Sequence, residues 1–363
     1  MFQPERLTLA RHRRGMNKTK LAQAVEVSLQ SIAAYERGDS SPSEETFDRL
    51  ADTLRFPRAF FYREMVDAVP VDAASFRKLS RMTASQRDAA LAAGTLCVEL
   101  NRWIEERFEL PEPDLPDINA GILDPEGAAA LVRSRWSLGE APIDNVLHLV
   151  EAHGVRVYSL TNECREIDAF SFWRDGRPFV CLGTHKTAER VVFDLAHELG
   201  HLVLHRDDSE PRGRTEERQA DRFAAHLLMP PNDVKALAPR FPTMKELVKA
   251  KTRWRVSVAA LNYHMHALGL TSDWHYRELC IDIARMGRDK EPNPIRRQQS
   301  QVLEQVLRAL RSDGLTRADI AEDLNIFQED LDDLVFGLTF SSVPGAGEPS
   351  EGGEQRRPNL RVV

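Results

Sequence analysis

The residues with the clearest chemical potential are two histidines and a glutamate in the segment His197-Glu198-Leu199-Gly200-His201. Four residues of an α-helix rotate about 40° past a full turn and rise about 6 Å, so His197 and His201 project from one helix face. Two imidazoles placed in this way can bind a single zinc ion. Glu198 lies about 100° around the helix from His197, where it can take a proton from a water that the metal has acidified. The spacing therefore predicts a metal-ligand pair and a general base.

The surrounding segment predicts the helix that this spacing requires. Apolar residues recur at three- and four-residue steps from Val191 to Val203, which is typical of a helix that is buried over much of its surface. Two histidines and a carboxylate are costly to bury beside such a stripe without a partner. A metal ion is the partner that fits them.

A catalytic zinc site usually has three protein ligands and one open position, so a third ligand is expected downstream. His205 lies about 12 Å along the helix axis from His197 and is not expected to share the ion. Glu217 lies near the start of a second predicted helix, and Asp221 follows it by four residues on the same face. We therefore expect Glu217 to be the third ligand and Asp221 to orient a ligand histidine. The neighbouring Glu216 points about 100° away from that pair.

The sequence leaves alternatives for two properties of this site, the identity of the metal ion and the residue that stabilises the oxyanion. Two histidines and one carboxylate favour Zn²⁺, with Mn²⁺ as the alternative ion. Peptide hydrolysis also needs a donor that stabilises the oxyanion. The alternatives for that donor, each of which could instead be structural, are Tyr158, His185, His226, Tyr263 and His264.

Three segments in this part of the chain resemble the ImmA/IrrE family of zinc metallo-endopeptidases. They are residues 193–205, Glu217-Arg218-Gln219-Ala220-Asp221-Arg222-Phe223-Ala224-Ala225, and Leu227-Leu228-Met229-Pro230. The similarity extends over roughly residues 125–270. It implies a small zincin-like α+β domain and an intracellular bacterial protease that cleaves a transcriptional repressor rather than proteins in general. Members of the family often lie beside, or are fused to, a helix-turn-helix domain.

The N-terminal 62 residues predict a bundle of short helices with a helix-turn-helix inside it. The expected helices are residues 4–14, 18–24, 29–37 and 43–54, with a short one after Pro57. Asn17 and Ser28 have the side chains that cap helix N-termini, and Gly38 suits the C-terminal end of the third helix. Two short helices joined by a tight turn are typical of a DNA-binding domain. A helical bundle used for protein contacts is the alternative.

The segment from Val27 to Gly38 resembles the recognition segment of the Cro/C1 (XRE) family, and the resemblance covers residues 6–62. It implies that Arg11 and Glu36 pair between the first and third helices. The residues expected to contact DNA are Asn17, Lys18, Ser28, Leu29, Gln30, Ser31 and Ala34. Gln30 can bond adenine bidentately in the major groove. Asn17, Lys18 and Ser28 lie at helix N-termini, where they are placed to bind phosphates.

The charge of the chain restricts where DNA can bind. The net charge is −7, so the whole molecule is not a general polyanion binder, and a nucleic-acid surface must be local. Residues 1–38 hold seven basic and three acidic side chains, a local charge of +4. By contrast, the helical stretch near Arg317 is strongly acidic and repels phosphate. We interpret that stretch as a partner-binding or dimerising module.

The remaining composition indicates a cytoplasmic protein. The four cysteines form no Cys-x-x-Cys pair, which is typical of reduced thiols. The N-terminus has no apolar signal region, and no apolar run approaches the length of about 20 residues that a membrane span needs. We therefore expect no contact with a membrane.

These observations predict a multidomain, mainly α chain. The expected parts are a helix-turn-helix bundle (1–62), a helical linker (63–117), an α+β zincin-like peptidase domain (118–272), a C-terminal helical module (273–340) and a disordered tail (341–363). The function expected is a bacterial transcriptional regulator, a homodimer on operator DNA, whose zinc endopeptidase cleaves a repressor or antitoxin-like protein or the chain itself. The alternative is a regulator or antitoxin without proteolysis, in which the zincin-like domain senses a signal or binds a partner.

Overall fold

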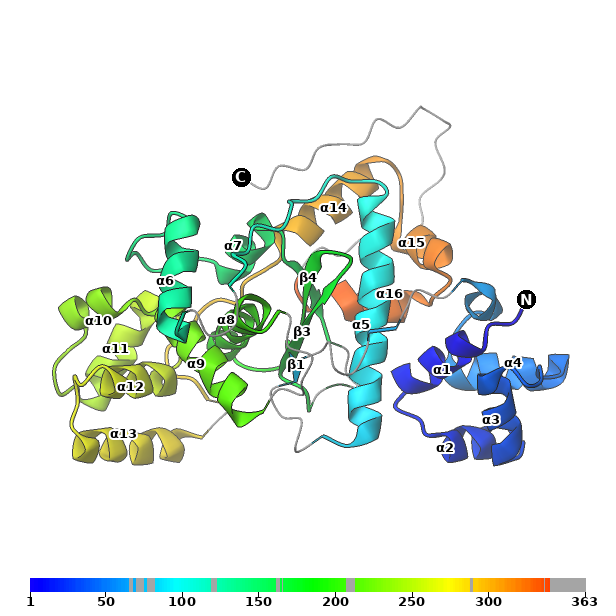
Figure 1. Cartoon of the computed structure of the whole chain (residues 1–363), viewed down its shortest axis with the longest axis horizontal. Coiled ribbons are helices and arrows are strands. Elements are labelled where there is room, and N and C mark those ends of the chain that lie inside the picture. The colour runs from blue at the N-terminus through cyan, green and yellow to red at the C-terminus, as the bar shows by residue number, and fades with distance from the viewer. Residues whose placement is uncertain are drawn as a thin grey trace. The chain divides into compact units, whose positions relative to one another are not determined.

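The structure is a computed structural model of the chain. It describes residues 1–64, 68–69, 75–76, 82–118, 123–160, 164, 166–206, 213–287, 290–335 and 337–339, so the predicted tail at 341–363 lies outside the described residues. The chain is mainly α-helical and multidomain, as predicted (Figure 1). It divides into two compact units. The first contains Met1–Pro111, Tyr158–Ile167 and the segment from Gln301 onward, and the second contains Glu112–Val157 and Asp168–Ser300.

The first unit begins with the predicted helical bundle. Its elements are α1 (Pro4–Arg13), α2 (Lys18–Ala24), α3 (Leu29–Arg37), α4 (Glu44–Leu54) and the 3₁₀ helix η1 (Arg58–Tyr62). The side chain of Asn17 accepts from the backbone N–H of Lys20, and that of Ser28 accepts from Ser31 N–H. Gly38 ends α3 in the left-handed region with φ 76°. These caps confirm the helix boundaries that the sequence indicated.

A long helix, α5 (Ala84–Glu105), packs on α1 within this unit (Figure 1). Thr83 and Gln86 form a reciprocal capping box at its start. Most of its residues are buried, and Glu99 pairs with Arg6 of α1 at 2.6 Å, both side chains being almost inaccessible. The part of the predicted linker that forms α5 is therefore a packed element of the first unit. The short strand β1 (Ser75–Phe76) precedes it.

The C-terminal helices α14 (Gln301–Ser312), α15 (Arg317–Leu324) and α16 (Gln328–Val335) belong to the same unit. Asp330 of α16 is buried and accepts from the guanidinium of Arg13 at 3.0 Å and from both terminal nitrogens of Arg14 at 2.7 Å. Asp323 of α15 accepts from Trp103 Nε1 of α5 at 2.9 Å. Part of the acidic surface that the sequence assigned to a partner is thus used against this chain's own helix-turn-helix bundle and α5.

The second unit contains an antiparallel hairpin of β3 (Ala169–Arg174) and β4 (Arg177–Leu182). The strand β2 (Arg156–Ser159) begins in this unit and ends in the first. The register pairs Ala169 with Leu182 and Arg174 with Arg177. This leaves Asp175 and Gly176 as the turn, both with positive φ, as a two-residue type I′ hairpin loop requires.

The second unit also contains helices. They are α6 (Pro125–Arg135), α7 (Val146–Ala152), α8 (Ala188–Leu204), α9 (Arg214–Leu228), α10 (Pro231–Leu237), α11 (Met244–Trp254), α12 (Val258–Ala267) and α13 (Asp273–Met286). Helix α8 packs on β3 and β4, and α9 packs on α8 and α6. Near the start of α8, the buried carboxylate of Glu189 accepts from Lys251 Nζ at 2.7 Å, which ties α8 to α11. None of the helices among the described residues combines the length and the apolar character needed to cross a membrane.

Candidate metal centre and DNA-binding surface

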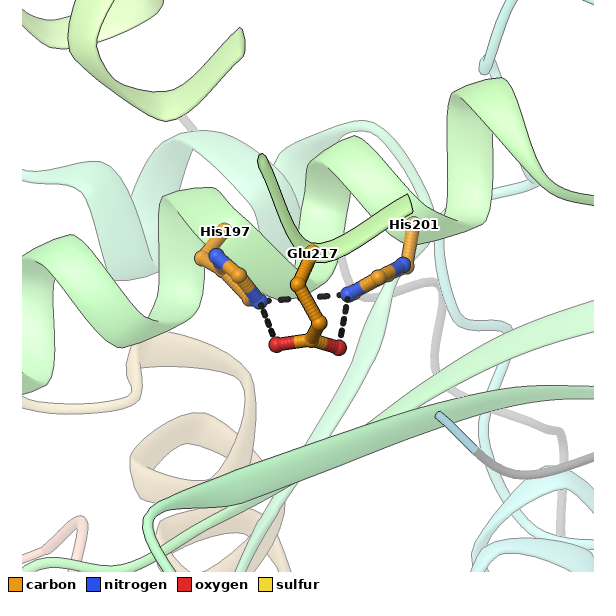
Figure 2. Close-up of side chains that lie close together, drawn as sticks. All are labelled: His197, His201 and Glu217. Atoms are coloured by element: carbon orange, nitrogen blue, oxygen red, sulfur yellow. Dashed lines mark hydrogen bonds and ion pairs between the residues drawn. The ribbon is translucent and has the colours of Figure 1, made fainter. Parts of the chain in front are cut away.

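The structure brings together the three residues that the sequence predicted as metal ligands (Figure 2). His197 and His201 project from α8, and Glu217 projects from the first turns of α9 between their imidazoles. The Nε2 atoms of the two histidines are 3.1 Å apart. The Glu217 carboxylate oxygens lie 3.6 Å from Nε2 of His197 and 3.3 Å from Nε2 of His201. Among the described residues, this group is the one whose ligand atoms all lie within 4.8 Å of one another.

These separations fit a zinc ion. Tetrahedral zinc with bonds of about 2.0–2.1 Å to nitrogen and oxygen holds its ligand atoms about 3.3 Å apart. The three separations of 3.1, 3.3 and 3.6 Å bracket that value. Two imidazoles and one carboxylate are also a donor set that zinc accepts, and three protein ligands leave one position for water or substrate.

Glu217 is ionised at neutral pH. Burial by itself would raise its pKa, but hydrogen bonds and attraction from His197 and His201 outweigh that effect and lower the pKa to about 2. The Glu217 carboxylate therefore offers a negative charge to a cation bound at this point.

Both histidines have a second partner at Nδ1. Asp221 Oδ1 lies 2.9 Å from Nδ1 of His197, in the position that the sequence predicted for an orienting carboxylate. Nδ1 of His201 lies 3.0 Å from Nδ1 of His205. An acceptor at Nδ1 keeps the proton there and leaves the Nε2 lone pair for a metal. The contact with Asp221 therefore directs the Nε2 lone pair of His197 toward the point where it meets the ligand atoms of His201 and Glu217.

Glu198 is buried. Its Oε2 accepts a hydrogen bond from the Ser171 hydroxyl of β3 at 2.7 Å. Ser171 was not predicted from the sequence, because a serine in a strand has no spacing that marks it. The contact ties the carboxylate that could act as general base to the hairpin beneath α8.

The close approach of α8 and α9 depends on Gly200. A Cβ built at this position would lie 3.0 Å from Phe223 Cδ1 and 3.3 Å from Ala220 Cα, both on α9. At the start of α9, Glu216 Oε2 accepts from Gly213 N–H at 2.7 Å and caps the helix. Glu216 thus points away from the centre, as predicted, while Glu217 reaches it.

The other candidate donors have structural partners or are exposed. His264 is buried and bonds the Met229 carbonyl through Nε2 at 2.9 Å, and His226 bonds the Arg222 carbonyl through Nδ1 at 2.9 Å. Tyr158 donates to Asn101 at 3.1 Å in the first unit. His185 and Tyr263 are exposed. None of these contacts identifies an oxyanion donor.

Helix α3 presents the predicted recognition residues at the surface of the first unit. Leu29 is 49% exposed, Gln30 is exposed, and Ser31 and Ala34 are half-buried, whereas Ile32 is fully buried in the bundle. The Ser28 and Asn17 side chains cap α3 and α2. The outward face of α3 therefore carries the residue types that the sequence assigned to base contacts.

Fewer positive side chains of this bundle are available to phosphates than its composition indicated, because several are paired with carboxylates. Arg11 pairs with Glu36 at 2.5 Å, as the resemblance implied, and Lys18 also contacts Glu36 at 3.0 Å. Arg6 pairs with Glu99, while Arg13 and Arg14 pair with Asp330. These arginines hold the first unit together, so the +4 charge is not all available to phosphates.

The comparisons with known proteins agree with this architecture. Residues 5–59 match a family model described as a helix-turn-helix domain. Residues 150–266 match a peptidase family model described as the IrrE N-terminal-like domain. No curated protein matches the chain. One chain thus carries both kinds of domain that the sequence resembled, a helix-turn-helix domain suited to double-stranded DNA and a metallopeptidase-like domain that contains His197, His201 and Glu217.

Proposed function

We propose that this protein is a DNA-binding transcriptional regulator whose second unit is a zinc-dependent endopeptidase. The single observation that carries the enzymatic part is the convergence of the His197 and His201 Nε2 atoms and the Glu217 carboxylate on one point, with Glu198 beside them. The match of residues 5–59 to a helix-turn-helix domain supports the regulatory part. We assign DNA binding to residues 1–62 and peptidase activity to residues 118–272, within a protein that binds its operator as a homodimer.

We assign the following roles to the side chains of the site. His197, His201 and Glu217 would hold zinc, and bound zinc supplies a Lewis acid that acidifies water and polarises a peptide carbonyl. Glu198 takes the proton from the attacking water and delivers it to the leaving amine. Ser171 donates to Oε2 of Glu198 and restricts the rotation of the carboxylate. Asp221 holds the His197 ring in the orientation that binding requires.

The substrate that we propose is a repressor or antitoxin-like protein, or this chain itself. The resemblance to the ImmA/IrrE family and the helix-turn-helix domain in the same chain support such a regulatory target over general protein digestion. A narrow target also means that standard peptide substrates are a poor assay. The test must therefore offer many natural proteins at once.

The experiment compares the wild-type chain with Glu198→Gln, both loaded with zinc, in a lysate of cells that lack the gene. Peptide analysis of new protein N-termini identifies cleaved lysate proteins, and the intact mass of the added chain reports self-cleavage. We expect new ends that appear with the wild type and are absent with Glu198→Gln. Because Glu198 is not a proposed ligand, equal zinc content of the two proteins is the control.

The absence of new N-termini from both samples, relative to lysate without added protein, would contradict the peptidase assignment. With zinc bound and DNA binding intact in both proteins, that outcome would identify a regulator whose metal domain senses a signal or binds a partner without turnover. Cleavage that persists in Glu198→Gln would contradict the role of this carboxylate as the base.

A further inference from the structure

His205 is not one of the proposed ligands, yet it is buried and contacts one of them. It follows the last residue of α8, and its side chain is almost inaccessible. Its Nδ1 lies 3.0 Å from Nδ1 of His201, and its Nε2 lies 2.8 Å from Oε1 of Gln219 on α9. The three side chains form a continuous line of hydrogen bonds from α9 to His201.

The side chain of Gln219 determines which atoms donate and which accept along this line of hydrogen bonds. The Oε1 atom of Gln219 is an acceptor, so Nε2 of His205 carries a proton and donates it. A neutral imidazole with a proton on Nε2 has a lone pair on Nδ1. Nδ1 of His205 therefore accepts, and Nδ1 of His201 donates. That arrangement leaves the Nε2 lone pair of His201 directed at His197 Nε2 and Glu217.

Two residues of α9 thus orient the two proposed ligand histidines, one by a direct contact and the other through a third side chain. Asp221 of α9 reaches His197 directly at 2.9 Å. Gln219 reaches His201 only through the ring of His205. His205 itself is not placed to bind the same ion, because its Nδ1 faces the Nδ1 of His201, on the side of that ring away from the centre.

We propose that His205 and Gln219 are positioning residues for the metal, which fix the tautomer and ring orientation of His201 and thereby set the metal affinity. This inference rests on the proposed zinc site. Partners of this kind behind a ligand histidine typically change metal affinity by about 10–100-fold when they are removed. The effect of Gln219 passes through His205, so the two residues act as one unit.

The test measures the zinc dissociation constant of the full-length chain by competition with a chromophoric chelator. His205→Phe keeps the ring volume but removes both nitrogens, and we expect zinc binding about 10–100-fold weaker. Gln219→Met removes the acceptor and should weaken binding in the same direction. Gln219→Glu keeps an acceptor at the same place and should retain wild-type affinity. The double variant His205→Phe/Gln219→Met should bind as His205→Phe does.

Two further measurements separate positioning from a purely structural role. Thermal unfolding of the metal-free variants reports whether the fold has changed. The visible spectrum of the Co²⁺-loaded chain reports the ligand set, which should stay that of two histidines and one carboxylate in His205→Phe. The matched control is His226→Gln, a histidine of α9 that bonds the Arg222 carbonyl, and it should bind zinc as the wild type does.

The outcomes distinguish this inference from the proposed function. A wild-type chain that binds no zinc would contradict the proposed function itself. Zinc binding by the wild type with equal affinity in His205→Phe would overturn the positioning role alone. A loss in His205→Phe as large as that in His201→Ala, with a changed Co²⁺ spectrum, would make His205 a ligand and would also overturn it.

Discussion

Arg13 and Asp330 form an ion pair at 3.0 Å although they come from opposite ends of the chain, and both side chains are almost completely buried. The pair joins α1 of the helix-turn-helix bundle to α16 of the C-terminal module. The guanidinium of Arg14 makes a bidentate contact with the same carboxylate. The C-terminal helices are thus part of the unit that carries the recognition helix.

We expect Asp330→Ala to destabilise the first unit by about 2–4 kcal/mol, because it leaves a buried guanidinium without its main counter-charge. Chemical denaturation followed by fluorescence measures the change. The matched control is Glu329→Ala, which removes the exposed neighbouring partner of Arg55 and should cost less than about 1 kcal/mol. Equal effects of the two substitutions would show that the buried pair is not what joins the C-terminal helices to α1.

Gly200→Ala should weaken the contact between α8 and α9. Alanine improves helix propensity by about 1 kcal/mol, but a Cβ 3.0 Å from Phe223 overpacks the interface, which typically costs about 1–3 kcal/mol. We expect a net loss of stability and weaker zinc binding, since Glu217 reaches the centre from α9. Adding Phe223→Leu should recover part of both losses. A Gly200→Ala chain that is more stable than the wild type would show that α9 can shift freely.

His264 should make the second unit less stable in mild acid. Burial, together with the nearby His226, lowers the pKa of His264 from 6.5 to about 4, although its bond to the Met229 carbonyl acts in the opposite direction. The unfolded chain therefore binds this proton more tightly than the folded one. The stabilisation is complete above pH 6.5 and is lost as the pH falls toward 4, by at most about 3 kcal/mol.

The measurement for His264 is the free energy of unfolding of the metal-free chain between pH 7 and pH 4. The variant His264→Asn has no titrating group at this position and should show a weaker dependence on pH. The half-buried His266 supplies a control, since His266→Gln leaves the buried site intact. An unchanged pH dependence in His264→Asn would contradict the assignment.

Gln30 is expected to contact one base of the bound DNA and so to contribute to sequence preference. Gln30→Ala should lose about 1–3 kcal/mol of discrimination at one position of the bound sequence, because a bidentate contact to adenine would be removed. Selection of bound duplexes from a random-sequence pool measures this preference for the full-length chain. Lys20→Ala, which removes an exposed cation from α2, should instead weaken binding to all duplexes and reduce its salt dependence. Identical preferences in the wild type and Gln30→Ala would remove Gln30 from the base contacts.

Much of the site could be predicted because helical geometry is local. The four-residue spacing of His197 and His201 places both on one face whatever surrounds them. The same rule predicted that Glu217 and Asp221 share a face of α9 and that Glu216 points elsewhere. The caps Asn17 and Ser28 likewise depend on neighbours three residues away. In each case a short stretch of sequence contains all the partners.

Contacts between distant segments could not be predicted in this way. The sequence shows that residues 315–333 are acidic, but not that Asp330 lies between Arg13 and Arg14. The basic side chains of residues 1–38 were therefore counted as available to DNA, whereas several are paired inside the first unit. Ser171 contacts Glu198 only because β3 runs beneath α8, and no local pattern encodes that approach. For His205, the distance along α8 argued against sharing the ion but did not show its contact with His201.

The central claim is that His197, His201 and Glu217 bind one metal ion and that Glu198 does not. Native mass spectrometry of the full-length chain, loaded with zinc and passed through a desalting column, measures metal per chain directly. We predict one zinc in the wild type and in Glu198→Gln, and little or none in Glu217→Ala and His201→Ala. Zinc content in Glu217→Ala equal to that of the wild type, or a wild-type chain without zinc, would contradict the claim.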